Sequence, residues 1–132
     1  MDNMIYAVIG NKKKPLHFSI NVMFSVIKKY KSVQNALEIM ENGGEEGFKA
    51  VQFLAVEMAN DSELCRRAAG YDPEPFIEES DVSVLMKPSV FVSLQDAICQ
   101  AISEGYAQEQ SDENEETDLG LLELRKKAKA GN

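Results

Sequence analysis

The side chains best suited to chemistry in this sequence are its single histidine, His17, and its two cysteines. A catalytic histidine needs a nucleophile and an orienting group brought to its ring. His17 stands between Leu16 and Phe18 in an alternating run, which places it on the polar side of an edge strand. No Gly-x-Ser-x-Gly elbow or matched cysteine motif accompanies it. The pattern therefore favours a solvated strand histidine over a catalytic base.

The two cysteines, Cys65 and Cys99, are isolated thiols in segments of helical pattern. A reactive thiol needs a cationic neighbour or a helix start that lowers its pKa, and neither position has an obvious one. Two single thiols without Cys-x-x-Cys spacing are typical of a reducing compartment rather than of a secreted disulfide scaffold. We expect both to be inert.

Two segments resemble ligand-binding loops without matching them. Gly43–Gly47 precedes a helix, but it carries two carboxylates and lacks the Gly-Lys-Ser/Thr ending of a phosphate loop. Further on, Thr117 occupies the sixth position of a calcium-like loop, where the sharp turn needs glycine. The oxygen-bearing residues at positions 1, 3, 5, 7 and 12 of that loop are Asp112, Asn114, Glu116, Asp118 and Glu123. The sequence thus predicts no catalytic residue, no cofactor and no metal site.

The composition is that of an ordinary soluble protein that acts on neither nucleic acid nor membranes. The 132 residues are 44% hydrophobic and 27% charged, with a formal net charge of −8 and a pI near 4.7. Such acidity opposes phosphate backbones and anionic lipid surfaces. No apolar run approaches the length of a membrane span, and the first residues lack the features of a signal peptide. We expect a cytoplasmic protein.

The elements that would position these residues begin with a hairpin. Residues 4–9 form an apolar run rich in β-formers, and a turn follows at Gly10 and Asn11. Residues 16–20 alternate, with apolar side chains at Leu16, Phe18 and Ile20 predicted to face the helices. Pro15, near the start of this second strand, suits a sheet edge.

Helical spacing takes over from Asn21, which is the predicted N-cap of a first helix. Ser32 would cap a second helix that ends at Gly43, and Asn60-Asp61-Ser62 would interrupt or recap a third that begins near Glu45 and ends at Gly70. Residues 72–75 are predicted to be extended. A short helix would follow from Ser80 to near Met86, and a final helix would have Pro88 in its first turn.

Together these patterns predict an α+β, mostly α, fold: an N-terminal β-hairpin, then a bundle of about four to six helices. The domain covers residues 1–106, and residues 107–132 form a disordered, flexible acidic tail with a Leu-rich basic tip. Tail leucines are the candidate partner-binding residues, although docking of the tip on its own domain is the alternative. These residues are Leu119, Leu121, Leu122 and Leu124.

Three segments in this order resemble the small tail assembly chaperones of long-tailed (siphovirus-type) phages and prophages of Gram-positive bacteria. They are the hairpin 5–20, the segment Arg66-Arg67-Ala68-Ala69-Gly70-Tyr71-Asp72-Pro73-Glu74-Pro75, and Asp118-Leu119-Gly120-Leu121-Leu122-Glu123-Leu124 after an acidic linker. The resemblance covers nearly the whole chain, but its motifs are loose and none is a catalytic signature. It implies a non-enzymatic protein that binds the tape measure protein, keeps that long helical chain soluble and helps recruit tail tube subunits. Many members of the family also exist in a longer form made by ribosomal frameshifting.

Two other classes remain open on the sequence. A small acidic adaptor or inhibitor of a mobile element would act by protein–protein binding and would show a contiguous acidic surface on its folded domain. An enzyme would show a deep pocket lined by perturbed titratable groups. In either class, and in the chaperone, the hairpin edge could pair with a second copy to form a homo-oligomer.

Overall fold

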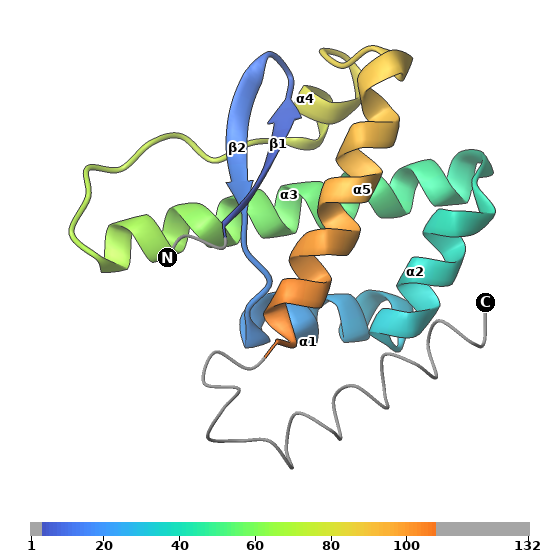
Figure 1. Ribbon diagram of the computed structural model, residues 1–132, viewed down its shortest axis with the longest axis horizontal. Helices are drawn as coiled ribbons and strands as arrows, with labels where there is room; N and C mark the ends of the chain where they lie inside the picture. Colours follow the sequence, from blue (N-terminus) through green and yellow to red (C-terminus); the bar gives the residue numbers. More distant parts are fainter. Residues whose placement is uncertain (1–3, 108–132) are drawn as a thin grey trace.

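The computed structural model describes residues 4–107, which form an N-terminal antiparallel hairpin followed by five helices (Figure 1). The long helix α3, Gly44–Ala68, runs through the middle of the molecule and contacts strand β2 and the other four helices. Helix α5, Pro88–Gly105, crosses α3 and packs on strand β1. The α+β, mostly helical fold predicted from the sequence is therefore confirmed.

The hairpin consists of β1, Ile5–Ile9, and β2, Lys12–Leu16. Its pairing runs from Ile5 opposite Leu16 to Ile9 opposite Lys12, so that the turn contains only Gly10 and Asn11. Gly10 has a φ of 68°, as the tight hairpin turn requires. Alternate residues of the hairpin enter the core; they are Ala7, Ile9 and Leu16.

The second strand begins and ends earlier in the sequence than the alternation predicted, because the two-residue turn pairs Lys12 directly with Ile9. Leu16 and Phe18 are buried as expected, but Ile20 is 68% exposed and begins a helix. That helix is α1, Ile20–Tyr30, and its N-cap is Ser19 rather than Asn21. The Ser19 hydroxyl accepts a hydrogen bond from the Val22 backbone N–H at 3.4 Å, so it satisfies one of the free donors of the first turn.

The second helix follows its prediction. Helix α2, Val33–Asn42, is capped by the Ser32 hydroxyl, which accepts from the Asn35 backbone N–H at 2.9 Å. It ends at Gly43, whose φ of 75° would strain a residue with a side chain. The chain then enters α3 directly.

Helix α3 contradicts the predicted interruption, because it continues through Asn60, Asp61 and Ser62 to Ala68. Asn, Asp and Ser side chains weaken a helix when they form hydrogen bonds with the neighbouring backbone. Here Asn60 and Asp61 bond to other elements instead, so the helix remains intact. Gly70, with a φ of 96°, follows the last turn as expected.

The connection from α3 to α5 is extended over residues 71–78, as the prolines predicted. Helix α4, Glu79–Ser83, is shorter than expected and is capped by Glu78 rather than by Ser80. Glu78 and Asp81 form a reciprocal capping box at its start. Helix α5 has Pro88 in its first turn, as predicted.

One apolar core joins the hairpin to the helices. The C-terminal end of α5 comes so close to the hairpin exit that a Cβ at Gly105 would lie 2.7 Å from the Phe18 carbonyl oxygen. The largest fully buried side chains come from α1, α3, α4 and α5; they are Val22, Val26, Val51, Leu54, Met58, Val82, Leu94 and Ile98.

Candidate functional site

The residues singled out by sequence are divided between described and undescribed parts of the chain. Tail residues Leu119, Leu121, Leu122 and Leu124, the rest of the acidic tail from 108 on and the calcium-like segment 112–123 lie outside the described residues. Gly43–Gly47 forms the turn between α2 and α3 and the first turn of α3. A Cβ at Gly47 would lie 3.0 Å from the Ile39 carbonyl oxygen, so this glycine allows α2 and α3 to approach closely.

His17 is partly exposed, as predicted, but it lies just after β2 rather than in the strand and its ring bonds to α3. It follows β2, its backbone N–H donates to the Met58 carbonyl at 3.1 Å, and its side chain is 42% exposed. Its Nδ1 lies 2.7 Å from Oδ2 of Asp61, a carboxylate that is only 7% exposed, and 3.3 Å from Sγ of Cys65. Sequence reasoning missed this cluster because its parts are more than 40 positions apart; the only signal was the i, i+4 spacing of Asp61 and Cys65 on α3.

The His17–Asp61–Cys65 cluster is not arranged as a catalytic triad. In a triad the nucleophile and the carboxylate contact opposite nitrogens of the imidazole. Here Asp61 and Cys65 both approach Nδ1 of His17. Partial burial, with the negative charge of Asp61, also raises the pKa of the Cys65 thiol, whereas a nucleophilic cysteine needs a lowered pKa.

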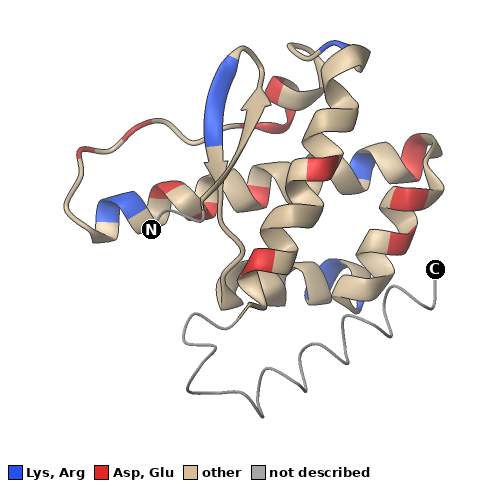
Figure 2. Cartoon of the chain, viewed as in Figure 1, with Lys and Arg blue, Asp and Glu red and all other residues tan. Residues whose placement is uncertain are grey.

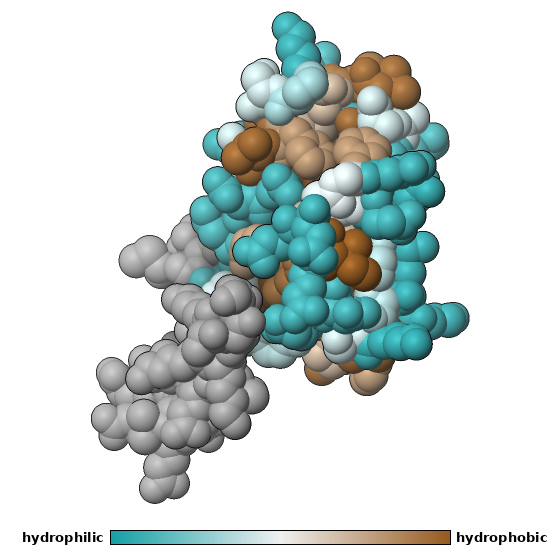
Figure 3. Space-filling model, turned by 90° about the vertical axis from the view of Figure 1, so that its right-hand side faces the viewer, coloured by the Kyte–Doolittle hydropathy of each residue, from teal (hydrophilic) through white to brown (hydrophobic). Residues whose placement is uncertain are grey.

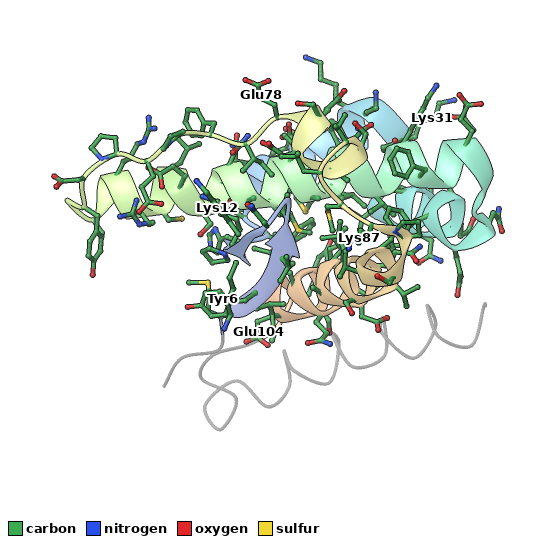
Figure 4. The ribbon with its side chains drawn as sticks, turned by 90° about the horizontal axis from the view of Figure 1, so that it is seen from above. Tyr6, Lys12, Lys31, Glu78, Lys87 and Glu104 are labelled. Atoms are coloured by element: carbon green, nitrogen blue, oxygen red, sulfur yellow. The ribbon has the colours of Figure 1, made fainter. Side chains whose placement is uncertain are left out.

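A second polar cluster holds the extended segment 71–78 along α3 (Figure 4 shows this segment as far as the labelled Glu78). Glu63 lies at its centre: its carboxylate accepts hydrogen bonds from the Glu74 backbone N–H at 2.7 Å, Arg67 at 2.9 Å and Arg66 at 2.8 Å. These bonds, that of Glu74 foremost, lower the pKa of Glu63 from 4.5 to about 2. Arg67 also stacks on the Phe76 ring at 4.3 Å. The cluster therefore fixes the connection rather than leaving a site for a ligand.

An apolar row lies on the outer side of α1. Ile20, Phe24 and Ile27 recur at i, i+4 and i+7 and are 68%, 61% and 36% exposed. The opposite side of the same helix places Val22 and Val26 in the core. A helix with apolar residues on both sides is typical of one that is covered by another surface.

A second group of exposed apolar side chains comes from the connection between α4 and α5 and from the first turns of α5. Val84, Leu85 and Val92 are 74%, 58% and 61% exposed. Nearby, Phe48 of α3 stacks on Phe91 of α5 with ring centroids 5.4 Å apart. Figure 3 shows apolar side chains gathered at this end of the molecule.

Acidic and basic residues are both distributed along the described elements (Figure 2). Exposed carboxylates gather at the corner between α2 and α3, where Glu45 pairs with Lys49 at 3.6 Å. Lysines lie on β2 and at the end of α1, where Figure 4 labels Lys31. Among the described residues, basic side chains thus accompany the acidic ones on several elements.

Comparisons with protein-family models, with curated proteins and with solved structures gave no match. None of the helices between residues 4 and 107 is both long enough and apolar enough to cross a membrane.

Proposed function

We propose that this protein is a tail assembly chaperone of a long-tailed phage or prophage that binds the tape measure protein and helps recruit tail tube subunits. It acts by reversible protein binding in the host cytoplasm, without catalysis. The observation that carries the proposal is the apolar row Ile20, Phe24 and Ile27 on the outer side of α1. The order of hairpin and helices, with the Arg66–Pro75 region spanning the end of α3 and the start of the extended segment, supports it through the family resemblance.

The chemistry of such a client fits the α1 row. A long amphipathic helix exposes apolar stripes that would aggregate in water, and packing of such a stripe along an exposed apolar row of another helix would cover it. A row of three side chains about two turns long offers a small contact, so each binding event is weak and readily reversed. That is what a chaperone needs if tail tube subunits are to displace it.

Leu119, Leu121, Leu122 and Leu124 would provide a second apolar contact with the client or with the tail tube protein. Replacing all four with serine is expected to leave the fold of residues 4–107 intact and to weaken capture of these partners in a pull-down. Capture equal to that of the unaltered chain would remove the tail leucines from the proposal.

The decisive test begins with the DNA downstream of the gene. A slippery heptamer near the last codons, an overlapping frame and then a very long helical reading frame would identify the client. Segments of that client can then be co-expressed with the unaltered protein or with the triple variant I20S/F24S/I27S. The variant should form at least about tenfold less complex than the unaltered protein, which corresponds to a loss of about 1.4 kcal/mol in binding free energy. The three side chains are exposed, so circular dichroism should show an unchanged fold.

A matched control is V84S/L85S, which removes exposed apolar side chains at the other end of the molecule. It should bind the client as the unaltered protein does. Equal binding by the α1 variant and the unaltered chain would contradict the proposal. An isolated gene with no such neighbour would favour the alternative, a small acidic adaptor or inhibitor protein, although the basic residues along the described elements support that class less well.

A further inference from the structure

The His17–Asp61–Cys65 cluster combines three different metal-binding atoms in one place. Nδ1 of His17, Oδ2 of Asp61 and Sγ of Cys65 all lie within 4.8 Å of one another. An imidazole nitrogen, a thiolate sulfur and a carboxylate oxygen are the three ligand types that zinc takes in proteins. We propose that His17, Asp61 and Cys65 bind a single zinc ion, with the fourth position open to water.

The backbone already holds the three ligands in position. Asp61 and Cys65 are four residues apart on the continuous helix α3, so they project from the same side, one turn apart. The His17 backbone N–H donates to the Met58 carbonyl, which fixes the end of β2 against the same helix. Little ordering is therefore left for the ion to impose.

The two separations from the imidazole nitrogen are close to those of a tetrahedral site, and the third, from Oδ2 to Sγ, is within 4.8 Å. Ligands at ordinary zinc bond lengths stand about 3.3 Å apart for nitrogen and oxygen and about 3.5 Å for nitrogen and sulfur. The observed separations are 2.7 Å from Nδ1 to Oδ2 and 3.3 Å from Nδ1 to Sγ. Binding requires the histidine and aspartate to part by about half an ångström, which small side-chain rotations at the exposed imidazole can provide.

Access and charge also suit the ion. Cys65 and the His17 ring are exposed, so an ion and a water molecule can reach the site, while Asp61 supplies a buried negative charge. One carboxylate and one thiolate balance the two positive charges of zinc. On binding, the thiol proton leaves to solvent and the imidazole binds through Nδ1 as the neutral tautomer with its proton on Nε2.

Cobalt(II) provides the direct test on the full chain, because it substitutes for zinc and reports its ligands by absorption. Equimolar cobalt should give a thiolate-to-cobalt charge-transfer band and the strong visible bands of four-coordinate cobalt, and equimolar zinc should abolish both. The variant Cys65→Ser should lose the charge-transfer band. Cys99→Ser removes the other free, exposed thiol and should keep it.

Zinc affinity measured by competition with a chromophoric chelator tests the other two ligands. His17→Gln and Asp61→Asn should each weaken zinc binding by at least about tenfold. Circular dichroism checks that each variant is folded, and Cys65→Ser carries the test if either is not. No charge-transfer band at equimolar cobalt, or a band lost in Cys99→Ser and kept in Cys65→Ser, would overturn the proposal and leave the cluster as hydrogen bonds joining β2 to α3.

Discussion

The two halves of helix α3 are held in the protein by different forces. In the first half, Val51, Leu54 and Ala55 are fully buried among apolar side chains of the other elements. In the second half, the buried residues beyond Met58 and Ala59 are polar; they are Asp61, Ser62 and Glu63. There, directed hydrogen bonds hold the hairpin exit and segment 71–78 against the helix. Apolar packing depends on the volume of the side chains and little on their orientation, whereas the hydrogen bonds of the second half depend on particular partner atoms.

The largest expected effect is in the apolar half. Leu54→Ala removes a side chain with no exposure and leaves a cavity that the surrounding helices can only partly fill. We expect a loss of about 3 kcal/mol in the free energy of unfolding. Urea unfolding followed by circular dichroism measures it, and a loss below 1 kcal/mol would show that this half is less tightly packed than its burial indicates.

A smaller and more local effect is expected in the polar half. The Asn60 side chain donates to the Ile77 carbonyl at 3.1 Å and accepts from the Ile77 backbone N–H at 2.8 Å. Asn60→Ala should cost about 1–2 kcal/mol, because it leaves two part-buried backbone groups without their partner. Hydrogen exchange should speed up at the Ile77 amide and in segment 71–78 but not in the first half of α3.

Gln52→Ala is the matched control for Asn60. Its side-chain amide also bonds to the backbone of the connection, at the Glu79 carbonyl, but at an exposed position. Gln52→Ala should lower the free energy of unfolding by less than Asn60→Ala does, and it should leave hydrogen exchange at the Ile77 amide unchanged. Equal effects from the two variants would mean that the second half of α3 does not depend on burial of its polar contacts.

The pH dependence of stability tests Glu63. Because its pKa in the folded protein is lowered to about 2 from 4.5, the stability it contributes is complete above about pH 4.5 and is lost as the pH falls toward 2. Glu63→Gln should flatten the decline of the unfolding midpoint across that window. Glu45→Gln, on the exposed first turn of α3, should follow the unaltered protein; a decline of equal slope in Glu63→Gln would contradict the assignment.

The smallest effect is expected at an ion pair on the surface of the first half. Lys49 and Glu45 lie 3.6 Å apart and both are exposed, so the water around them screens their attraction. Lys49→Ala should change the free energy of unfolding by less than about 0.5 kcal/mol. A larger loss in urea unfolding would mean that charge, and not only apolar packing, holds this half.

The same contrast explains which features were predictable from the sequence. Apolar periodicity, Ser32, Gly43 and Pro88 predicted α2, the first half of α3 and α5, because those signals act through the local backbone. Asn60-Asp61-Ser62 was misread as an interruption, because the partners that keep the helix intact come from residues 17 and 77.

The candidate sites were harder to predict than the fold. His17 looked like a solvated residue because its neighbours in sequence do not reveal the carboxylate and the thiol that α3 brings to it. The exposed apolar row on α1 could not be predicted from the sequence for a related reason. The alternation assigns Ile20 to a strand facing the helices. Only the position of the Ser19 cap and the packing of Val22 and Val26 settle which side of the helix is outside.

The hairpin has a consequence for how copies of the chain meet. In a two-stranded sheet each strand is an edge, and an unprotected edge invites addition of a further strand. Strand β2 carries Lys12, Lys13 and Lys14 in succession and then Pro15, which has no amide hydrogen to donate. A strand added to this edge would meet the exposed ammonium groups of Lys12 and Lys13 and, at Pro15, a missing hydrogen-bond donor, so the β2 edge is protected against strand addition.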